Sequence, residues 1–127
     1  MSHTLMSPGR GYSNIVIAEP GRTVFIAGQI GWDASGKMTS SSFEGQFEQA
    51  LSNVVSLVRE AGGQPTDICR VTIYVTDRQA YLDAAKEIGA AYRRLMGKHY
   101  PAMTAVEVKA LVEATAKVEI EATAVIA

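Results

Sequence analysis

Two carboxylates near the end of the chain are the strongest candidates for acid–base chemistry. Glu119 and Glu121 flank Ile120 in a segment with the alternation of a β-strand, where residues two apart share one face and lie about 6.5–7 Å apart. A carboxylate held in a pocket can orient a water molecule or accept its proton. The alternative is that both side chains are solvated and pair loosely with lysines such as Lys117. The residues alone leave both interpretations open.

Other reactive side chains are few and isolated. Cys69 is the only cysteine, and since no histidine or aspartate pattern near it indicates a nucleophile, we expect a small buried side chain at the start of a strand. His3 and His99 lack the spaced carboxylates or cysteines that a metal site would need. The sequence therefore indicates neither a metal nor a cofactor.

The composition is that of one small globular domain comprising residues 1–127. Hydrophobic residues make up 47% and charged residues 20% of the chain, and its net charge is −1. This near-neutral balance gives no electrostatic footprint for nucleic acid or an anionic membrane. No apolar run is as long as a membrane span, which needs about 20 residues. The N-terminus lacks the charged and then apolar segments of a signal peptide. With its lone cysteine, the chain is expected to be cytoplasmic.

The N-terminal third is predicted to hold an irregular arm and a hairpin. The first fourteen residues, rich in glycine, proline and serine, indicate the arm. Residues 15–18 and 23–27 are β-rich runs separated by a turn that contains Pro20-Gly21. Two such runs around a proline–glycine turn are typical of paired antiparallel strands.

Two amphipathic helices are predicted in the middle of the chain. The first begins near Ser41 or Ser42, with Ser41 and Glu44 as a capping box, and ends at the glycines 62–63. Its apolar stripe consists of Phe43, Phe47, Leu51, Val54, Val58 and Ala61. The second follows Asp77 and ends at Gly97, with Leu82, Ala85, Ile88, Tyr92 and Leu95 on its buried side. Arg93 and Arg94 on this helix either form a solvated face or supply positive charge to a pocket of a neighbouring subunit.

The strands of the C-terminal half set the fold class. A strand at 71–76 is followed, after the second helix, by strands at about 103–109 and 116–126, which gives an α+β layer with both helices on one side of a mixed sheet. Side chains alternate across a strand. The apolar face, with Thr104, Val106, Val108 and the even positions from Val118 to Ile126, is expected against the helices. The mixed face, with Met103, Ala105, Glu119 and Glu121, is then left for water or another subunit.

Motifs along nearly the whole chain resemble those of the Rid/YjgF family, the reactive-intermediate deaminases. Residues 100–108 (YPAMTAVEV) resemble the family signature, and residues 24–31 (VFIAGQIG) resemble its first motif. Residues 46–63 resemble its first helix, residues 71–77 its central strand, and residues 118–122 part of its closing pair of strands. The resemblance implies the chorismate-mutase-like α+β fold, a mixed sheet with two helices on one face, assembled as a homotrimer. In that assembly the uncovered sheet faces form a central barrel, and three small-molecule pockets lie between subunits.

Several positions match the family's pocket. Tyr12 matches a tyrosine that approaches the ligand, and Glu119 matches the catalytic glutamate that holds the attacking water. The family's serine–glycine pair becomes Ala27 and Gly28, so that a hydroxyl is lost while the backbone amide of Gly28 remains. A pocket asparagine of the second helix corresponds to Gly89.

Two pocket positions, 103 and 105, differ from the family pattern. Met103 stands where members that hydrolyse imines and enamines carry an arginine that clamps the substrate carboxylate, and Ala105 stands where many carry cysteine. A guanidinium binds a carboxylate through a planar fork of donors, whereas methionine has no donor. We therefore expect a more apolar floor and weak or absent activity on substrates like 2-aminoacrylate.

Three functions are consistent with this sequence. The first is hydrolysis of an imine or enamine that is not anchored by the family's arginine–carboxylate clamp, and retained Tyr12 and Glu119 favour it. The second is a non-catalytic trimer that binds a small molecule, which the missing arginine and serine favour. The third is a ribonuclease or translation inhibitor, as some relatives are labelled. The weakly acidic balance and the absence of a basic stripe argue against the third.

Overall fold

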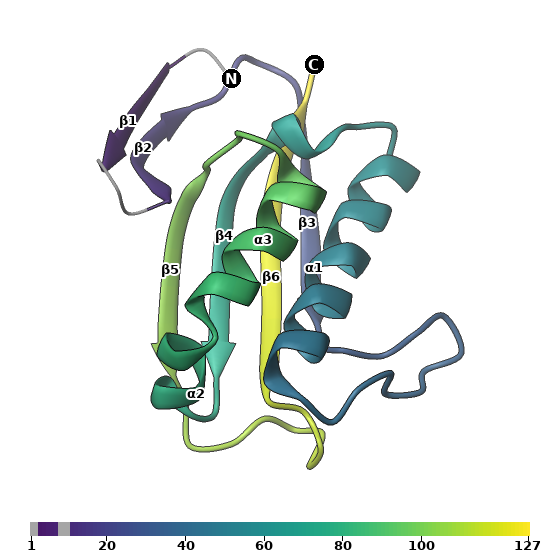
Figure 1. The fold of residues 1–127 in the computed structure, drawn as a ribbon. Helices are drawn as coiled ribbons and strands as arrows, with labels where there is room; N and C mark the ends of the chain where they lie inside the picture. Colours follow the sequence, from purple (N-terminus) through teal and green to yellow (C-terminus); the bar gives the residue numbers. More distant parts are fainter. Residues whose placement is uncertain (1–2, 8–10) are drawn as a thin grey trace.

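A six-stranded mixed sheet is the framework of the protein. The computed structural model describes residues 3–7 and 11–127, and the side chains from residue 11 onward. The strands lie in the order β1-β2-β5-β4-β6-β3 (Figure 1). Their bounds are β1 His3–Ser7, β2 Tyr12–Ile17, β3 Arg22–Gln29, β4 Ile68–Val75, β5 Ala102–Glu107 and β6 Val118–Ile126. The helices are α1 Phe43–Glu60, the 3-10 turn η1 Pro65–Asp67, α2 Arg78–Asp83 and α3 Ala85–Met96.

The predicted hairpin between residues 15–18 and 23–27 does not form. Strand β2 pairs with β1 on one side and with β5 on the other, while β3 pairs with β6. The arm was also expected to be irregular, but His3–Ser7 is a strand; residues 1–2 and 8–10 lie outside the described residues. The turn chemistry at Pro20-Gly21 is local, whereas the partner of β3 lies about a hundred residues further along the chain. The long alternating strand β6 takes the hydrogen bonds of β3, and the turn only redirects the chain.

Helix α1 follows the predicted apolar stripe from Phe43 to Val58 and begins after Ser42, one of the two predicted starts, but the predicted capping box does not form. Its N-cap is Ser42, whose hydroxyl accepts a hydrogen bond from the backbone amide of Gly45 at 3.1 Å. The capping box of Ser41 with Glu44 is therefore wrong, because the residue at the third helical position is a glycine. Gly62, with φ +96°, reverses the chain after the last turn, as a left-handed glycine does at a helix end.

The second predicted helix is two helices. The side chain of Asp77 caps α2 by accepting from the amides of Gln79 and Ala80 at 2.9 and 3.2 Å. Helix α2 ends at Asp83, and Ala84 separates it from α3, which begins at Ala85. Leu82, predicted to be buried, is 54% exposed, and Ala85 is exposed as well. Both residues face a cavity instead of a packed core, which is why the apolar pattern misplaces them.

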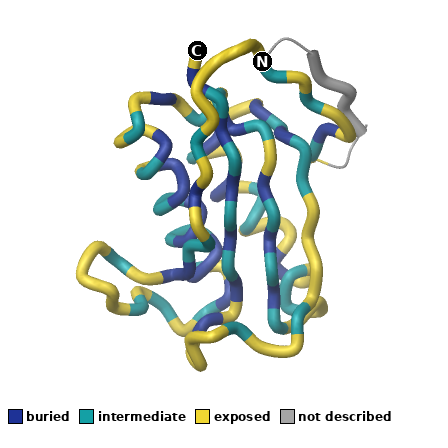
Figure 2. Tube along the Cα trace, turned by 180° about the vertical axis from the view of Figure 1, so that it is seen from behind, coloured by how far each residue is buried: buried dark blue, intermediate teal, exposed yellow. Residues whose placement is uncertain are grey.

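The helices cover one face of the sheet and leave the other open (Figures 1 and 2). On β6 the even-numbered residues were predicted to face the helices. This is correct, since the buried residues of the strand are Val118, Ile120, Ala122, Ala124 and Ile126. The first four of these join the stripe of α1 and the inward residues of β4 in one core. Within the described ranges, no helix is long and apolar enough to cross a membrane.

On β5 the alternate residues that were predicted to face the helices face the open side, and the reverse holds for the others. Met103 is paired with Val71 and Ala105 with Ile73, and directly paired residues share a face, so Met103 and Ala105 lie on the helix side. Val106 is on the open face and is 41% exposed. The parallel register of β5 with β4 decides which residues of β5 face the helices. Apolar alternation misleads on β5 because the helices do not fully cover this strand.

Candidate functional site

A cavity between β5 and the helices α2 and α3 brings together Tyr12, Met103 and Ala105. It has a volume of about 620 Å³, and Gly89 also lines it. Met103 is half-buried and packs against the hydrophobic core from the cavity floor. Three of the predicted ligand-binding residues therefore line one cavity of a single chain, although Tyr12 is about ninety residues away from Met103 and Ala105 in the sequence.

Tyrosines form a fixed wall of this cavity. Tyr92 and Tyr100 stack with ring centroids 5.6 Å apart and an interplanar angle of 9°. The Tyr92 hydroxyl donates to the carbonyl of His99 at 2.5 Å, and the ring Nε2 of His99 lies 2.6 Å from the carbonyl oxygen of Ile68. Burial raises the pKa of Tyr92, and the same cause raises that of Tyr81. Burial thus favours the neutral forms of Tyr81 and Tyr92, and the hydrogen bonds of His99 hold Tyr92 in place.

The sequence left open whether Arg93 meets solvent or a pocket of a neighbouring subunit. The structure places it at the cavity of its own chain. Its neighbour Arg94 points elsewhere and forms an ion pair with Glu48. Phe47, Tyr81 and Tyr100 also line the cavity and were not predicted to do so. Only the packing of α3 over β5 reveals them.

The remaining predicted residues lie on the opposite, open face. Glu119 pairs with Tyr74 across β4 and β6, and it is half-buried. A Cβ on Gly28 would overlap its carboxyl group, with the Glu119 Cδ only 2.7 Å away. Ala27 adjoins Gly28 at the end of β3. The predicted site is thus two groups that the sheet of one chain keeps apart.

Glu119 and Glu121 differ in their surroundings. The hydroxyl of Tyr74 donates to Oε1 of Glu121 at 2.5 Å, and this hydrogen bond raises the pKa of Tyr74. Within the described part of the chain, the carboxylate of Glu119 has no hydrogen-bond or ion-pair partner. Of the two carboxylates, Glu119 is the one available to hold a water molecule.

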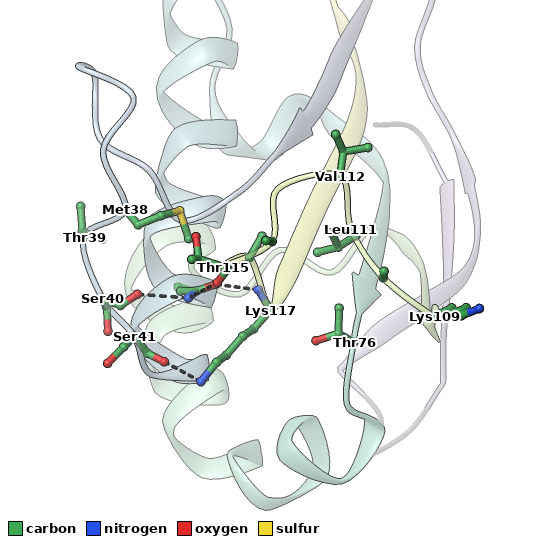
Figure 3. Close-up of a pocket in the computed structure, with 14 residues that line it drawn as sticks. Met38, Thr39, Ser40, Ser41, Thr76, Lys109, Leu111, Val112, Thr115 and Lys117 are labelled. Carbon is green, nitrogen blue, oxygen red and sulfur yellow. Dashed lines mark hydrogen bonds between the residues drawn. The ribbon is translucent and has the colours of Figure 1, made fainter.

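A larger hollow of about 1020 Å³ lies between residues 38–41 and 109–117 (Figure 3). The side chain of Gln46 donates to the carbonyls of Ser40 and Thr115, both at 3.1 Å. Lys117 donates its Nζ to the carbonyl of Ser41 at 2.6 Å, and Figure 3 shows Lys109 directed away. These contacts hold two loops together, so the polar groups are engaged in structure.

The other reactive side chains form no site of their own. Cys69 is half-buried, with its Sγ 3.4 Å from the carbonyl oxygen of Thr123, and burial raises the pKa of its thiol. A raised pKa disfavours the thiolate that a nucleophile needs. Among the residues whose side chains are described, no three of His, Cys, Asp and Glu are grouped as metal ligands.

Known proteins resemble this chain over most of its length. The family model described as endoribonuclease L-PSP matches residues 3–126. A human 2-iminobutanoate/2-iminopropanoate deaminase is 30% identical over 125 residues, which cover 96% of this chain and 86% of that protein. The protein with the same name from Salmonella typhimurium is 33% identical over 108 residues, covering 83% and 80%.

Solved structures match over the same length. A protein of unknown function of the conserved Rid family from Yersinia pestis superposes with a TM-score of 0.82 at 33% identity, covering 96% of this chain and 97% of the other. RidA from an Antarctic Psychrobacter superposes with a TM-score of 0.71 at 30% identity, covering 97% and 94%. Family model, relatives and fold agree over nearly all residues, and the chain belongs to the Rid/YjgF family.

Proposed function

We propose that the protein hydrolyses an imine or enamine to a carbonyl compound and ammonia. The site combines the cavity of one copy with Gly28 and Glu119 of a neighbouring copy in a homotrimer. The observation that carries this proposal is the unpartnered carboxylate of Glu119 beside Gly28. Relatives at about 30% identity that are named deaminases support the reaction class.

The proposed chemistry needs one base and one donor. The carboxylate of Glu119 orients a water molecule and takes its proton as the oxygen attacks the carbon of the C=N bond. The resulting tetrahedral adduct collapses to C=O, and its nitrogen leaves as ammonia after protonation. In this proposal the backbone N–H of Gly28 binds the forming oxygen. A positioned carboxylate in such a role typically contributes about 10²–10⁴-fold in rate.

The cavity floor sets which substrates react. Met103 offers no hydrogen-bond donor to a carboxylate, and Ala105 beside it is small and apolar. A charged group that loses its partner in a buried site typically costs about 2–5 kcal/mol. Small substrates such as 2-aminoacrylate, which depend on that contact, are therefore expected to react poorly.

A non-catalytic binding function is the second candidate. Met103 and Ala27 replace an arginine and a serine hydroxyl of the pattern, which favours a protein that binds a small molecule without turning it over. A ribonuclease has less support: the net charge is −1, and nucleic acid binding depends on clustered cations.

A panel of imino acids tests the proposal. The imines are generated in place by an amino acid oxidase from small, branched and aromatic amino acids, and release of the 2-oxo acid is followed with and without the protein. We expect acceleration by the wild type and its loss in Glu119→Gln. The matched control is Glu121→Gln, on the same strand face but bonded to Tyr74, which should retain turnover. Equal loss in both variants, or wild-type turnover of 2-aminoacrylate equal to that of an arginine-bearing relative, contradicts the proposal. Ligand-dependent melting shifts without turnover identify the binding protein.

A further inference from the structure

We propose that Arg93 is the anchor for an anionic ligand in the cavity above Met103. The cation would then come from helix α3 of the same chain and not from the strand position that Met103 occupies. The ligand is a carboxylate that carries a large apolar or aromatic group. Its identity as a substrate rests on the proposed function, whereas the anchoring of the anion does not.

The geometry of α3 directs the guanidinium to the cavity. Gly89 and Arg93 are four residues apart on this helix, and side chains on a helix lean toward its N-terminus over the preceding turn. Nη1 of Arg93 lies 3.3 Å from the place that a Cβ on Gly89 would occupy. The missing side chain of Gly89 therefore leaves room for the guanidinium at the cavity, where the family pattern has an asparagine.

The charge of Arg93 is not used elsewhere in the described chain. Arg93 is the only charged residue among the described residues that line the cavity, and no ion pair or hydrogen bond of its guanidinium is found there. Arg94, next to it, is already paired with Glu48. Arg93 is exposed in the single chain, and a ligand that fills the cavity would exclude water from one side of the guanidinium and so strengthen its attraction for an anion.

The shape and lining of the cavity define the rest of the ligand. Its volume is about 620 Å³, and Tyr81, Tyr92 and Ile88 line it. A three-carbon imino acid would leave most of this space to water, while a branched or aromatic side chain would bury apolar surface against these walls. The inferred substrate class is therefore imino acids derived from large apolar amino acids.

Binding of phenylacetate, compared with its neutral analogue phenylacetamide, tests the anchor without any turnover. The affinities are measured by titration calorimetry and by chemical-shift changes of the cavity residues, for the wild type, Arg93→Gln and the matched control Arg94→Gln. A hydrogen bond to a charged group typically accounts for about tenfold or more in affinity. We expect about this loss of phenylacetate binding in Arg93→Gln, little change in Arg94→Gln, and weak phenylacetamide binding that Arg93→Gln does not alter. Arg93→Lys should recover part of the loss.

Three outcomes would overturn the anchor: no phenylacetate binding by the wild type, equal binding of acid and amide, or the same loss in both arginine variants. Shifts confined to residues outside the cavity would overturn it as well. Failure of the proposed function looks different. In that case phenylacetate binding still depends on Arg93, while no imino acid in the panel is hydrolysed faster than without the protein.

Discussion

The carboxyl group of Glu119 packs against the bare Cα of Gly28, in space that any side chain at residue 28 would fill. This contact joins β6 to the end of β3, two strands that are neighbours in the sheet. The side chain of Glu119 lies beside Gly28 and has no hydrogen-bonding partner in the described chain. In the proposed reaction this pair supplies the base and the donor for water attack on a C=N bond.

Gly28→Ala should separate catalysis from stability. The added Cβ would meet the far end of a flexible glutamate side chain, which can rotate away. We therefore expect the free energy of unfolding to change by about 1 kcal/mol or less. Turnover of the best imino acid should fall about tenfold or more, because the base leaves its place. Thermal melting and steady-state kinetics measure the two effects, and unchanged turnover would show that the position of Glu119 is irrelevant.

Gly89→Ala should raise stability and weaken anion binding at the same time. Glycine inside a helix costs about 1 kcal/mol relative to alanine, so the melting temperature should rise. The new Cβ would come 3.3 Å from Nη1 of Arg93 and push the guanidinium from its place by a few tenths of an ångström. Phenylacetate affinity should then fall by a few-fold. Ala90→Gly, one residue further along the exposed side of α3, is the control and should lower stability without changing affinity.

Met103→Arg should restore activity on small substrates. A guanidinium at this position would extend from the cavity floor and bind a carboxylate through two donors. We expect kcat/KM for 2-iminopropanoate to rise about tenfold, and stability to fall by up to about 1 kcal/mol because the new cation repels Arg93. Replacing Arg93 by Gln in the same chain should recover the stability and keep the gain. No gain in kcat/KM would mean that residue 103 does not face the substrate.

Local periodicity predicted what depends on one element alone. The stripe of α1 and the buried parity of β6 follow from spacing, because each element packs along its full length against the core. The predicted hairpin between residues 15–18 and 23–27 is wrong because the partner of β3 is remote in sequence. The predicted facing of the β5 side chains was wrong. The parallel register with β4, and not the apolar alternation of β5 itself, decides which side Met103 faces.

The candidate site was predicted less completely than the fold. Resemblance indicated Tyr12, Met103 and Ala105, and these residues do line one cavity; their contact with a ligand stays a prediction. Arg93 could not be assigned, since a solvated arginine and a cavity arginine have the same sequence pattern. The structure shows that Arg93 is exposed and also lines the cavity, with its guanidinium beside Gly89.

The buried tyrosines should make the protein sensitive to high pH. The folded chain holds the pKa of Tyr92 above its usual value near 10, by burial. Burial favours the neutral phenol in the folded state. The contribution of Tyr92 to the free energy of unfolding is therefore fully present below pH 10 and is lost as the pH rises further. Denaturant unfolding should therefore show a steeper loss of stability above pH 10 in the wild type than in Tyr92→Phe. That variant also loses the hydrogen bond to His99, so its stability should be lower at neutral pH. Parallel pH curves for the two proteins would contradict the prediction.

The open face of the sheet should join three copies, and Phe25 is the residue that tests it. Its side chain lies on β3 and is 80% exposed in the single chain, and burying a phenylalanine contributes about 1.5–3 kcal/mol. Light scattering should give about three times the chain mass of 13.6 kDa for the wild type. Phe25→Asp should give a monomer, because an unpaired carboxylate is costly to bury. Ser56→Asp, at an exposed position of α1 on the other side of the sheet, controls for added charge. The monomer should lose imine turnover, since Glu119 of one copy no longer reaches the cavity of another. It should still bind phenylacetate through Arg93, whose cavity belongs to one chain. A monomer that keeps full turnover would show that the two halves of the site work without a second copy.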